Sequence, residues 1–562
     1  MPSMIPRLAV ALLTAAVLGS GEQEAYFDLL IRNGIVLDGT GNPGVRADIG
    51  IRGDVIEAIG DLDTAPAQRV IDASGLHVAP GFIDMHSHAD TGFVSGDIDA
   101  RRAPNLVSQG ITTVVFGADG RNQLWPIDEE TTAYRKYGVA INVVPMVGHG
   151  TVRSRVLGDD FQRAATPDEL EQMKALVRQG MEEGAWGIGA GPEYSPGIWS
   201  TPEELVELAQ VIAPFDGFYY AHQRSQARLP RWQLPSMIDG PTLDGIDGLA
   251  ETIDIAVQTG IRVVGSHVKA KGRSSWGRSF MDTKMIELAR SQGHQVYLDH
   301  YPYETNMGGP TMVFPAWALE GGHQSLRQRL EDQRTRHLLE VDLEHMIDQS
   351  GGPGRLIITH HVDPKLVGKT VSEVAVERQS SLVETLIDFA LAGTEFMPAG
   401  LRIRPLSMSE YDNDQYIRQD YTATCTDGGV RTAPGGNPGM HPRYWGAFPR
   451  KIARYVKERS VITLPFAVRS MSGLAAQIIA LPDRGLVREG YAADLTIFDF
   501  DRIQDRATIM EPGLPSVGIE YVLVNGQLAI DGAIPTGTLT GKVLLRHEIR
   551  RSNVAGREAT VA

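Results

Sequence analysis

Residues 81–88 read GFIDMHSH, a short apolar run that ends in two histidines. Side chains alternate between the two faces of a β-strand, so His86 and His88 point the same way, as two ligands of one ion must. Eight is the number of strands that closes a (β/α)8 barrel, whose functional groups lie at the C-terminal strand ends. Seven further apolar runs end in polar side chains and complete that number: TTVVFGAD (112–119), NVVPMVGHG (142–150), GIGAGPEY (187–194), FYYAHQR (218–224), VVGSHVK (263–269), QVYLDHYPY (295–303) and TATCTDGG (422–429).

The segments between these runs favour helices. Residues 166–184 and 247–260 are two clear helical stretches, and their alternation with apolar runs predicts βα units around a parallel sheet. We therefore expect an α/β protein whose TIM-like barrel spans residues 81–484. The segment 304–420, after the seventh run, is too long for a simple loop and contains an amphipathic stretch. It is predicted to be an insertion that acts as a lid over the barrel mouth.

The two ends of the chain have a different texture. Short alternating runs between Gly, Asn and Asp turns fill residues 26–80 and return in 485–550, which predicts one small β-sandwich domain built from both ends. Residues 1–21 combine a lone positive charge, an apolar run and small residues, the layout of a secretory signal peptide. The protein is therefore expected to be exported, to the periplasm or outside the cell, with no membrane span in the mature chain.

Composition excludes several classes of function. Of 562 residues, 42% are hydrophobic and 22% charged, which is typical of a soluble globular protein rather than a disordered or multispan one. Lys and Arg number 53 against 69 Asp and Glu, and the resulting charge of −16 argues against nucleic acid or an anionic membrane as the main partner. Cys425 is the single cysteine, so neither an intrachain disulfide nor a cysteine-cluster metal site can form.

Histidines at strand ends indicate a metal site. His222 and His267 each lie near the end of a predicted strand, in the same phase as His86 and His88. Neutral imidazole together with carboxylate suits a zinc-like ion, which makes hydroxide available at neutral pH by lowering the pKa of water. A carboxylate must then take up the proton and pass it to the leaving group, and Asp427 is placed for that role.

Several motifs resemble the amidohydrolase superfamily, and more narrowly its D-aminoacylase (N-acyl-D-amino-acid deacylase) branch. The resemblance runs from about residue 28 to about residue 544. SHVK, D-x-YPY and HPR-x-x-G-x-FPR together are specific to this branch. The motifs are APGFIDMHSHAD (79–90), YYAHQRSQ (219–226), VVGSHVKAKG (263–272), YLDHYPYE (297–304), CTDGG (425–429), HPRYWGAFPRKIARYV (441–456), LPDRGLVREGYAADLTIFD (481–499) and VLVNGQ (522–527).

The resemblance implies a distorted TIM barrel with a small β-sandwich, and hydrolysis of the amide of an N-acyl-D-amino acid. It implies one or two zinc ions, with a binuclear centre expected, and a small-molecule N-acyl amino acid as the partner. His86 and His88 match the first metal site, and His222 and His267 match ligands of the second. Asp427 matches the catalytic acid/base, while Lys269 and Tyr301 match substrate-binding positions. Arg224, beside His222, is a further cation for an anionic substrate.

The chain departs from the branch at one metal ligand. D-aminoacylases typically carry a ligating cysteine in a G-N-C-G context after the second strand, where this chain has GADG and hence Asp119. Cys425 belongs to the eighth run and cannot replace it. The superfamily more broadly bridges its metals with a carboxylate from the fourth strand, where Glu193 stands. We therefore expect a bridging Glu193, with Asp119 as the alternative, and an oxygen-rich site.

Two other functions stay open at this point. The same scaffold supports dipeptidases and cyclic-amide hydrolases of the hydantoinase or dihydroorotase kind, and a metal-free barrel could serve as a binding module. The presence of all four histidines and Asp427 argues against the last. The acyl group, the side chain accepted, strict D over L preference and the oligomeric state are not determined by the sequence.

Overall fold

The computed structural model describes residues 27–306, 313–397, 399–435 and 440–549. Its centre is a barrel of parallel strands, and each of the eight predicted runs contributes to it, the third as two short strands. The barrel strands are β6 (Phe82–Asp84), β7 (Ile111–Phe116), β8 (Asn142–Pro145), β9 (Val147–Gly148), β10 (Gly187–Ala190), β11 (Phe218–Ala221), β12 (Arg262–Gly265), β13 (Val296–His300) and β16 (Thr422–Thr424).

Hydrogen bonding orders these strands into two arcs that close on one another. One arc is β6-β7-β8 and the other is β9-β10-β11-β12-β13-β16. The arcs meet where the chain passes from β8 to β9, and a parallel bridge between Ser87 and Gly428 joins the ends of β6 and β16. All residues of these strands are buried, as expected for strands with helices outside and side chains inside. Their C-terminal ends therefore meet at one mouth.

Helices surround the barrel and begin at the signals in the sequence. The stretch predicted at 166–184 forms α6, whose first turn is held by a capping box of Thr166 and Glu169. The stretch predicted at 247–260 forms α8, capped by Asp244. The helices outside the insertion are α1 (Asp90–Phe93), α2 (Ile98–Arg102), α3 (Pro104–Val107), α4 (Ile127–Tyr137), α5 (His149–Leu157), α6 (Pro167–Glu182), α7 (Pro202–Ile212), α8 (Gly245–Thr259), α9 (Ser279–Ser291), α16 (Arg443–Arg450), the π-helix η9 (Lys451–Glu458), α17 (Leu464–Met471) and α18 (Gly473–Ile479).

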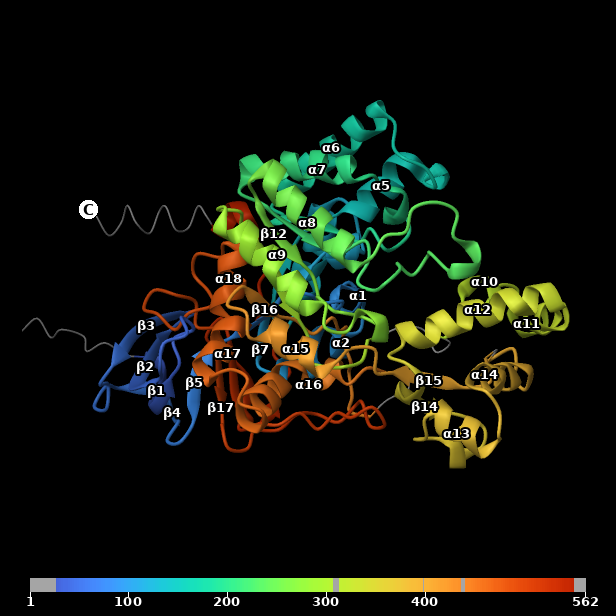
Figure 1. Cartoon of the computed structure of the whole chain (residues 1–562). Coiled ribbons are helices and arrows are strands. Elements are labelled where there is room, and N and C mark those ends of the chain that lie inside the picture. Colours follow the sequence, from blue (N-terminus) through green and yellow to red (C-terminus); the bar gives the residue numbers. More distant parts are fainter. Residues whose placement is uncertain (1–26, 307–312, 398, 436–439, 550–562) are drawn as a thin grey trace, which may run out of the picture.

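Strands from both chain ends share one sheet, seen at the lower left of Figure 1. The two ends join directly through β5 and β17, where Val78 pairs antiparallel with Ile497. A separate apolar core, which includes Leu29, Ile51 and Leu523, fills this part of the molecule. The strands are β1 (Phe27–Val36), β2 (Val45–Arg52), β3 (Val55–Gly60), β4 (Ala67–Asp72), β5 (His77–Pro80), β17 (Leu495–Phe498), β18 (Ile519–Val524), β19 (Gln527–Asp531) and β20 (Ile534–Pro535). All nine lie within the segments predicted to form the β domain, although the division into domains stays a prediction.

Most of the segment between β13 and β16 projects from the barrel, at the right of Figure 1, whereas its last helix, Glu410–Ile417, packs against α9. It has an apolar core of its own, which includes Leu326, Leu343 and Ile387. The amphipathic stretch predicted at 323–348 forms α11 and α12. The elements of the insertion are α10 (Ala316–Leu319), α11 (Gly322–Glu331), α12 (Gln333–Gln349), β14 (Leu356–His360), α13 (Val371–Glu377), α14 (Leu382–Leu391), β15 (Arg402–Pro405) and α15 (Glu410–Ile417).

The predicted signal peptide, residues 1–21, lies outside the described residues. Among the residues that are described, every helix is too short or too polar to cross a membrane.

Candidate metal centre

Four histidines meet at the barrel mouth in two pairs. His86 and His88 follow β6, and their Nε2 atoms lie 3.2 Å apart. His222 follows β11 and His267 follows β12, and His222 Nδ1 lies 2.9 Å from His267 Nε2. The barrel therefore brings together all four histidines that the sequence singled out, with one nitrogen of each ring facing a common space.

Asp119 lies between the two pairs. Its Oδ1 is 3.7 Å from His86 Nε2, 3.6 Å from His222 Nδ1 and 3.7 Å from His267 Nε2, and its Oδ2 is 3.5 Å from His88 Nε2. The residue holds a left-handed backbone conformation with φ of 53°, which is uncommon outside glycine and turns the carboxylate into the mouth. Oδ1 is buried and has no hydrogen-bond partner among the described residues.

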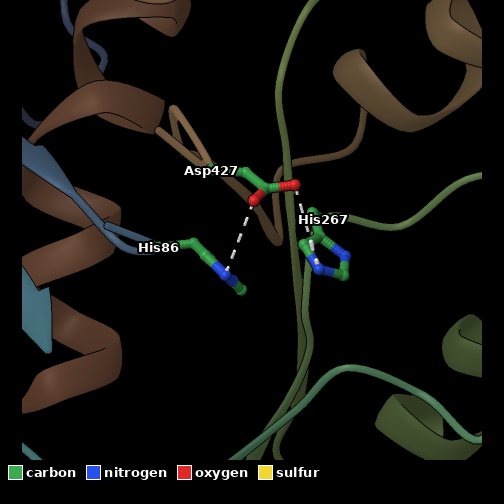
Figure 2. Close-up of side chains that lie close together, drawn as sticks. All are labelled: His86, His267 and Asp427. Atoms are coloured by element: carbon green, nitrogen blue, oxygen red, sulfur yellow. Dashed lines mark ion pairs between the residues drawn. The ribbon is translucent and has the colours of Figure 1, made fainter. Parts of the chain in front are cut away.

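Asp427 approaches the same space from the end of β16. Its Oδ1 lies 3.4 Å from His88 Nε2 and 3.8 Å from His86 Nε2, and its Oδ2 lies 4.0 Å from His267 Nε2. Figure 2 shows the carboxylate between the rings of His86 and His267. Oδ2 also forms an ion pair with Arg443, whose Nη1 lies 2.7 Å away.

These residues fit a divalent metal. Three sets each place three donor atoms within 4.8 Å of one another: His86, His88 and Asp119; Asp119, His222 and His267; and His86, His267 and Asp427. A buried carboxylate oxygen without a donor is costly unless a cation satisfies it, and Asp119 Oδ1 is such an atom. Imidazole nitrogens combined with carboxylate oxygens are the donor set that suits zinc.

The prediction that Glu193 bridges two metals is wrong for this geometry. Glu193 Oε2 lies 2.7 Å from Nε2 of His222, the nitrogen that faces away from Asp119, and Oε1 accepts a hydrogen bond from the Arg231 amide. At the end of β10, Glu193 thus contacts the outer nitrogen of His222 and does not face the space that the four histidines share. Asp119, the alternative in the sequence, takes the central position.

The outward nitrogens of the other histidines also have partners. His86 Nδ1 lies 2.6 Å from Ser266 Oγ. His267 Nδ1 lies 2.9 Å from Lys269 Nζ and 3.2 Å from Gln226 Nε2. Such contacts fix the ring orientation and are a general feature of metal-binding histidines. Ser266 and Gln226 were missed in the sequence because nothing in their neighbourhood marks them as histidine partners.

The electrostatics of the site favour a bound cation. Burial holds the pKa of His86 well below its usual value and lowers the pKa of His267 to about 4, so both rings are neutral, the form that binds metal. Burial opposes ionisation of Asp119 and Asp427, but interactions with the surrounding histidine rings lower the pKa of Asp119, and the charge of Arg443 lowers the pKa of Asp427. Burial also opposes protonation of His88, yet its hydrogen bond to Asp427 raises its pKa to about 9. The site therefore attracts positive charge.

A cationic wall lies beside Asp427. Lys269 Nζ lies 5.2 Å from the centre of the Tyr301 ring, and Arg443 Cζ lies 4.7 Å from it. All three residues line a small cavity of about 30 Å³ together with His222, His267 and Asp427. The Tyr301 hydroxyl is buried and has no hydrogen-bond partner among the described residues. Burial lowers the pKa of Lys269 to about 8. Lys269 and Tyr301, which the resemblance assigns to substrate binding, both line this cavity, and that role stays a prediction.

Arg224 does not belong to this wall. Its guanidinium donates to both carboxylate oxygens of Glu251, at 2.7 and 3.2 Å, and is buried against Ser200. An arginine held in this way is not available to a substrate, so the prediction of a substrate-binding Arg224 is corrected. Arg443 lines the small cavity, whereas Arg224 does not. The signal for Arg443 was the HPR motif at 441–443, which served only to mark the resemblance.

A barrel mouth with two histidine pairs, a central carboxylate and a further aspartate is the architecture of a metal-dependent hydrolase. Comparison with known proteins agrees. The model of the Amidohydrolase family matches residues 69–218 and 423–530. A D-aminoacylase of Alcaligenes xylosoxydans xylosoxydans is 33% identical over 543 residues, which are 92% of this chain and 98% of that protein.

Two solved structures extend the likeness to the fold. A D-aminoacylase studied for its binuclear metal center is 30% identical, with a TM-score of 0.70 over 92% of this chain and 99% of the other. N-acyl-D-glutamate deacylase from Bordetella bronchiseptica, solved with zinc and a phosphonate inhibitor, is 29% identical, with a TM-score of 0.70 over 93% and 100%. The chain belongs to the amidohydrolase family, in the group of the D-aminoacylases. It is therefore a hydrolase of C–N amide bonds, and the predicted barrel with a β-sandwich is confirmed.

Proposed function

We propose that this protein is a zinc-dependent deacylase of N-acyl-D-amino acids. The observation that carries the proposal is the position of Asp427, which lies within 4.0 Å of His86 and His267 and 2.7 Å from Arg443 of the cationic wall. A group that accepts a proton is thereby placed between a metal-binding site and a site for a carboxylate. The inference that the substrate has the D configuration rests on the relatives, whose names describe them as acting on D-amino acid derivatives.

His86, His88, His222 and His267 would hold the zinc, with Asp119 between the pairs. When bound, zinc would lower the pKa of water to about 7 and polarise a carbonyl oxygen. Because Asp119 Oδ1 lies within 3.7 Å of nitrogens from both pairs, Asp119 would act as a ligand together with either pair, which suits the expected binuclear centre.

Asp427 moves the proton in this mechanism. Its pKa is held below the usual range, so the carboxylate is ionised at neutral pH and can accept a proton from water. The proton then passes from a carboxylate oxygen to the departing nitrogen, which leaves as the free amine of the amino acid. Arg443 holds Asp427 in place through its ion pair with Oδ2.

The cationic wall binds the carboxylate of the amino acid. Lys269 and Arg443 flank the Tyr301 ring, and the free Tyr301 hydroxyl can donate to a carboxylate oxygen. Charge-assisted hydrogen bonds of this kind fix the substrate so that its amide lies beside Asp427.

A larger cavity of about 840 Å³ adjoins the wall, because Arg231 and Lys271 line both cavities. It lies between the barrel mouth and the insertion, which supports the predicted lid. We place the amino-acid side chain here and expect it to be apolar. The apolar lining includes Trp232, Leu234, Phe314, Trp317, Leu319 and Met346.

The test is hydrolysis of N-acetyl-D-leucine by the zinc-loaded protein, measured as release of D-leucine. N-acetyl-D-leucine is expected to be hydrolysed, N-acetyl-L-leucine not, and removal of zinc by a chelator should abolish the activity. Dipeptides and a hydantoin serve as comparison substrates, because the dipeptidase and cyclic-amide alternatives predict faster hydrolysis of those compounds. Preference for either would overturn the proposal.

We also propose that the protein is exported after cleavage near residue 21. The layout of residues 1–21 supports this. Cell fractionation followed by N-terminal sequencing tests it. A protein that is found in the cytoplasm with residues 1–21 still attached would contradict this proposal.

A further inference from the structure

A second large cavity opens on the other side of the histidines. It has a volume of about 800 Å³ and is lined by His88, Asp119, Arg121, Tyr194, Arg431 and Tyr444, among others. It shares only Tyr194 with the small cavity at the cationic wall. The His88 side chain is 38% exposed and the Asp119 side chain 15% exposed, so the metal site is open on this side.

The geometry of an amide determines which part of the substrate enters this cavity. A trans amide directs the substituents of its carbonyl carbon and its nitrogen to opposite sides. If the amino-acid half lies at Lys269, Tyr301 and Arg443, the acyl half must extend past His88 and Asp119. The cavity is far larger than an acetyl group needs, since pockets of roughly 300–1,000 Å³ enclose drug-sized ligands.

Two arginines give the cavity its charge. Neither Arg121 nor Arg431 has a carboxylate within 4.0 Å among the described residues. Arg121 Nη2 donates to the Ser195 carbonyl at 3.1 Å. Arg431 donates to the Val430 carbonyl at 2.6 Å and to Met440 Sδ at 3.2 Å, and it stacks on Tyr444 with Cζ 4.1 Å from the ring centre.

The carboxylates that line the cavity do not neutralise these arginines. Asp90 accepts hydrogen bonds from Gln123 Nε2 at 3.1 Å and from the Thr91 amide at 2.9 Å. Asp119 faces the four histidines. Both guanidinium groups therefore keep free donors for an anion, and the planar fork of an arginine matches a carboxylate.

We propose that this cavity binds the acyl group and that the preferred acyl groups carry a carboxylate of their own, as in the monoamide of a dicarboxylic acid. The inference rests on the proposed function and specifies its substrate class. Water adds across the C–N bond: the carbonyl carbon takes the oxygen and the nitrogen takes the proton. The products are a dicarboxylate and a free D-amino acid.

The test compares N-succinyl-D-leucine with N-butyryl-D-leucine, whose acyl groups both have four carbons but differ in the terminal carboxylate. We expect kcat/KM to be about tenfold higher or more for the succinyl substrate, the effect of one charge-assisted hydrogen bond. Arg121→Ala and Arg431→Ala should each lower the ratio of kcat/KM for the succinyl substrate to that for the butyryl substrate by about tenfold. Arg121→Gln, which keeps most of the side chain, should have the same effect if the charge matters.

A matched control is Arg488→Ala, which removes an exposed arginine remote from the mouth and should keep the wild-type ratio. Calorimetric titration of the Asp427→Asn variant with the two substrates gives a second readout, and the succinyl compound should bind more tightly. If the butyryl compound and N-acetyl-D-leucine are hydrolysed without preference for succinyl, the inference fails and the proposed function stands. If none of the three compounds is hydrolysed, both fail.

Discussion

Replacing Glu193 with glutamine and Asp119 with asparagine separates the two roles that the structure gives to these carboxylates. Glu193 contacts His222 at 2.7 Å through the nitrogen that faces away from the site, whereas Asp119 lies within 3.7 Å of nitrogens from all four histidines. Glutamine keeps the shape and one hydrogen bond to His222 but loses the charge. Asparagine removes the charge from the centre of the site.

The expected magnitudes differ. Loss of a residue that orients a ligand lowers metal affinity by about 10- to 100-fold, so Glu193→Gln should weaken zinc binding by that factor. This corresponds to about 1.4 to 2.7 kcal/mol. Asp119→Asn should lower the affinity for zinc by more than about 100-fold and leave at most one ion per chain, because the residue contacts both histidine pairs.

Zinc content after dialysis and competition with a chromophoric chelator measure these affinities. Glu251→Gln is a matched control, because Glu251 is a partly buried glutamate near the site that contacts Arg224 and no histidine. It should keep the wild-type zinc content. A Glu193→Gln variant that loses zinc as completely as Asp119→Asn, or an Asp119→Asn variant that keeps two ions, would refute this interpretation of the site.

Three further predictions follow from the same geometry. Asp427→Asn should lower kcat by about 10²- to 10⁴-fold with zinc content unchanged, and an active variant would refute its role in proton transfer. Arg443→Met should raise KM for N-acetyl-D-leucine far more than Arg224→Met, because only Arg443 lines the cavity; equal effects in steady-state kinetics would contradict this. Leu343 is fully buried in the core of the insertion, so Leu343→Ala should destabilise that segment by about 2.7–5 kcal/mol in chemical denaturation, and a change below 1 kcal/mol would contradict its place there.

The sequence predicted the barrel well because strand ends carry their own signal. Each apolar run stops at a polar residue, and the parallel arrangement then brings all these residues to one mouth. His86, His88, His222 and His267 could therefore be selected from fifteen histidines without any knowledge of distances. The helical stretches were predictable for a similar reason, since their caps and apolar periods are local.

The direction of a side chain at the end of a strand was not predictable. Glu193 and Asp119 both follow barrel strands, but the left-handed backbone at Asp119 turns its carboxylate inward, while Glu193 passes behind His222. Arg224 is drawn to Glu251, a helix residue 27 positions later, and no sequence pattern reveals that pair. Such outcomes depend on tertiary contacts rather than on local periodicity.

The internal structure of the insertion could not be predicted from the sequence either. Its helices α11 and α12 were visible as an amphipathic stretch, but the antiparallel pairing of β14 with β15 joins segments more than forty residues apart. This unit also has a core of its own, so few local signals in the sequence determine how it packs against the barrel.

The role of Asp119 at the metal centre is tested most directly by a crystal structure of the zinc-loaded protein, with diffraction data recorded on both sides of the zinc absorption edge. Two anomalous peaks are expected at the barrel mouth, one beside His86 and His88 and one beside His222 and His267, with the Asp119 carboxylate between them. A single peak that Asp119 does not contact, or two peaks bridged by Glu193, would contradict this role.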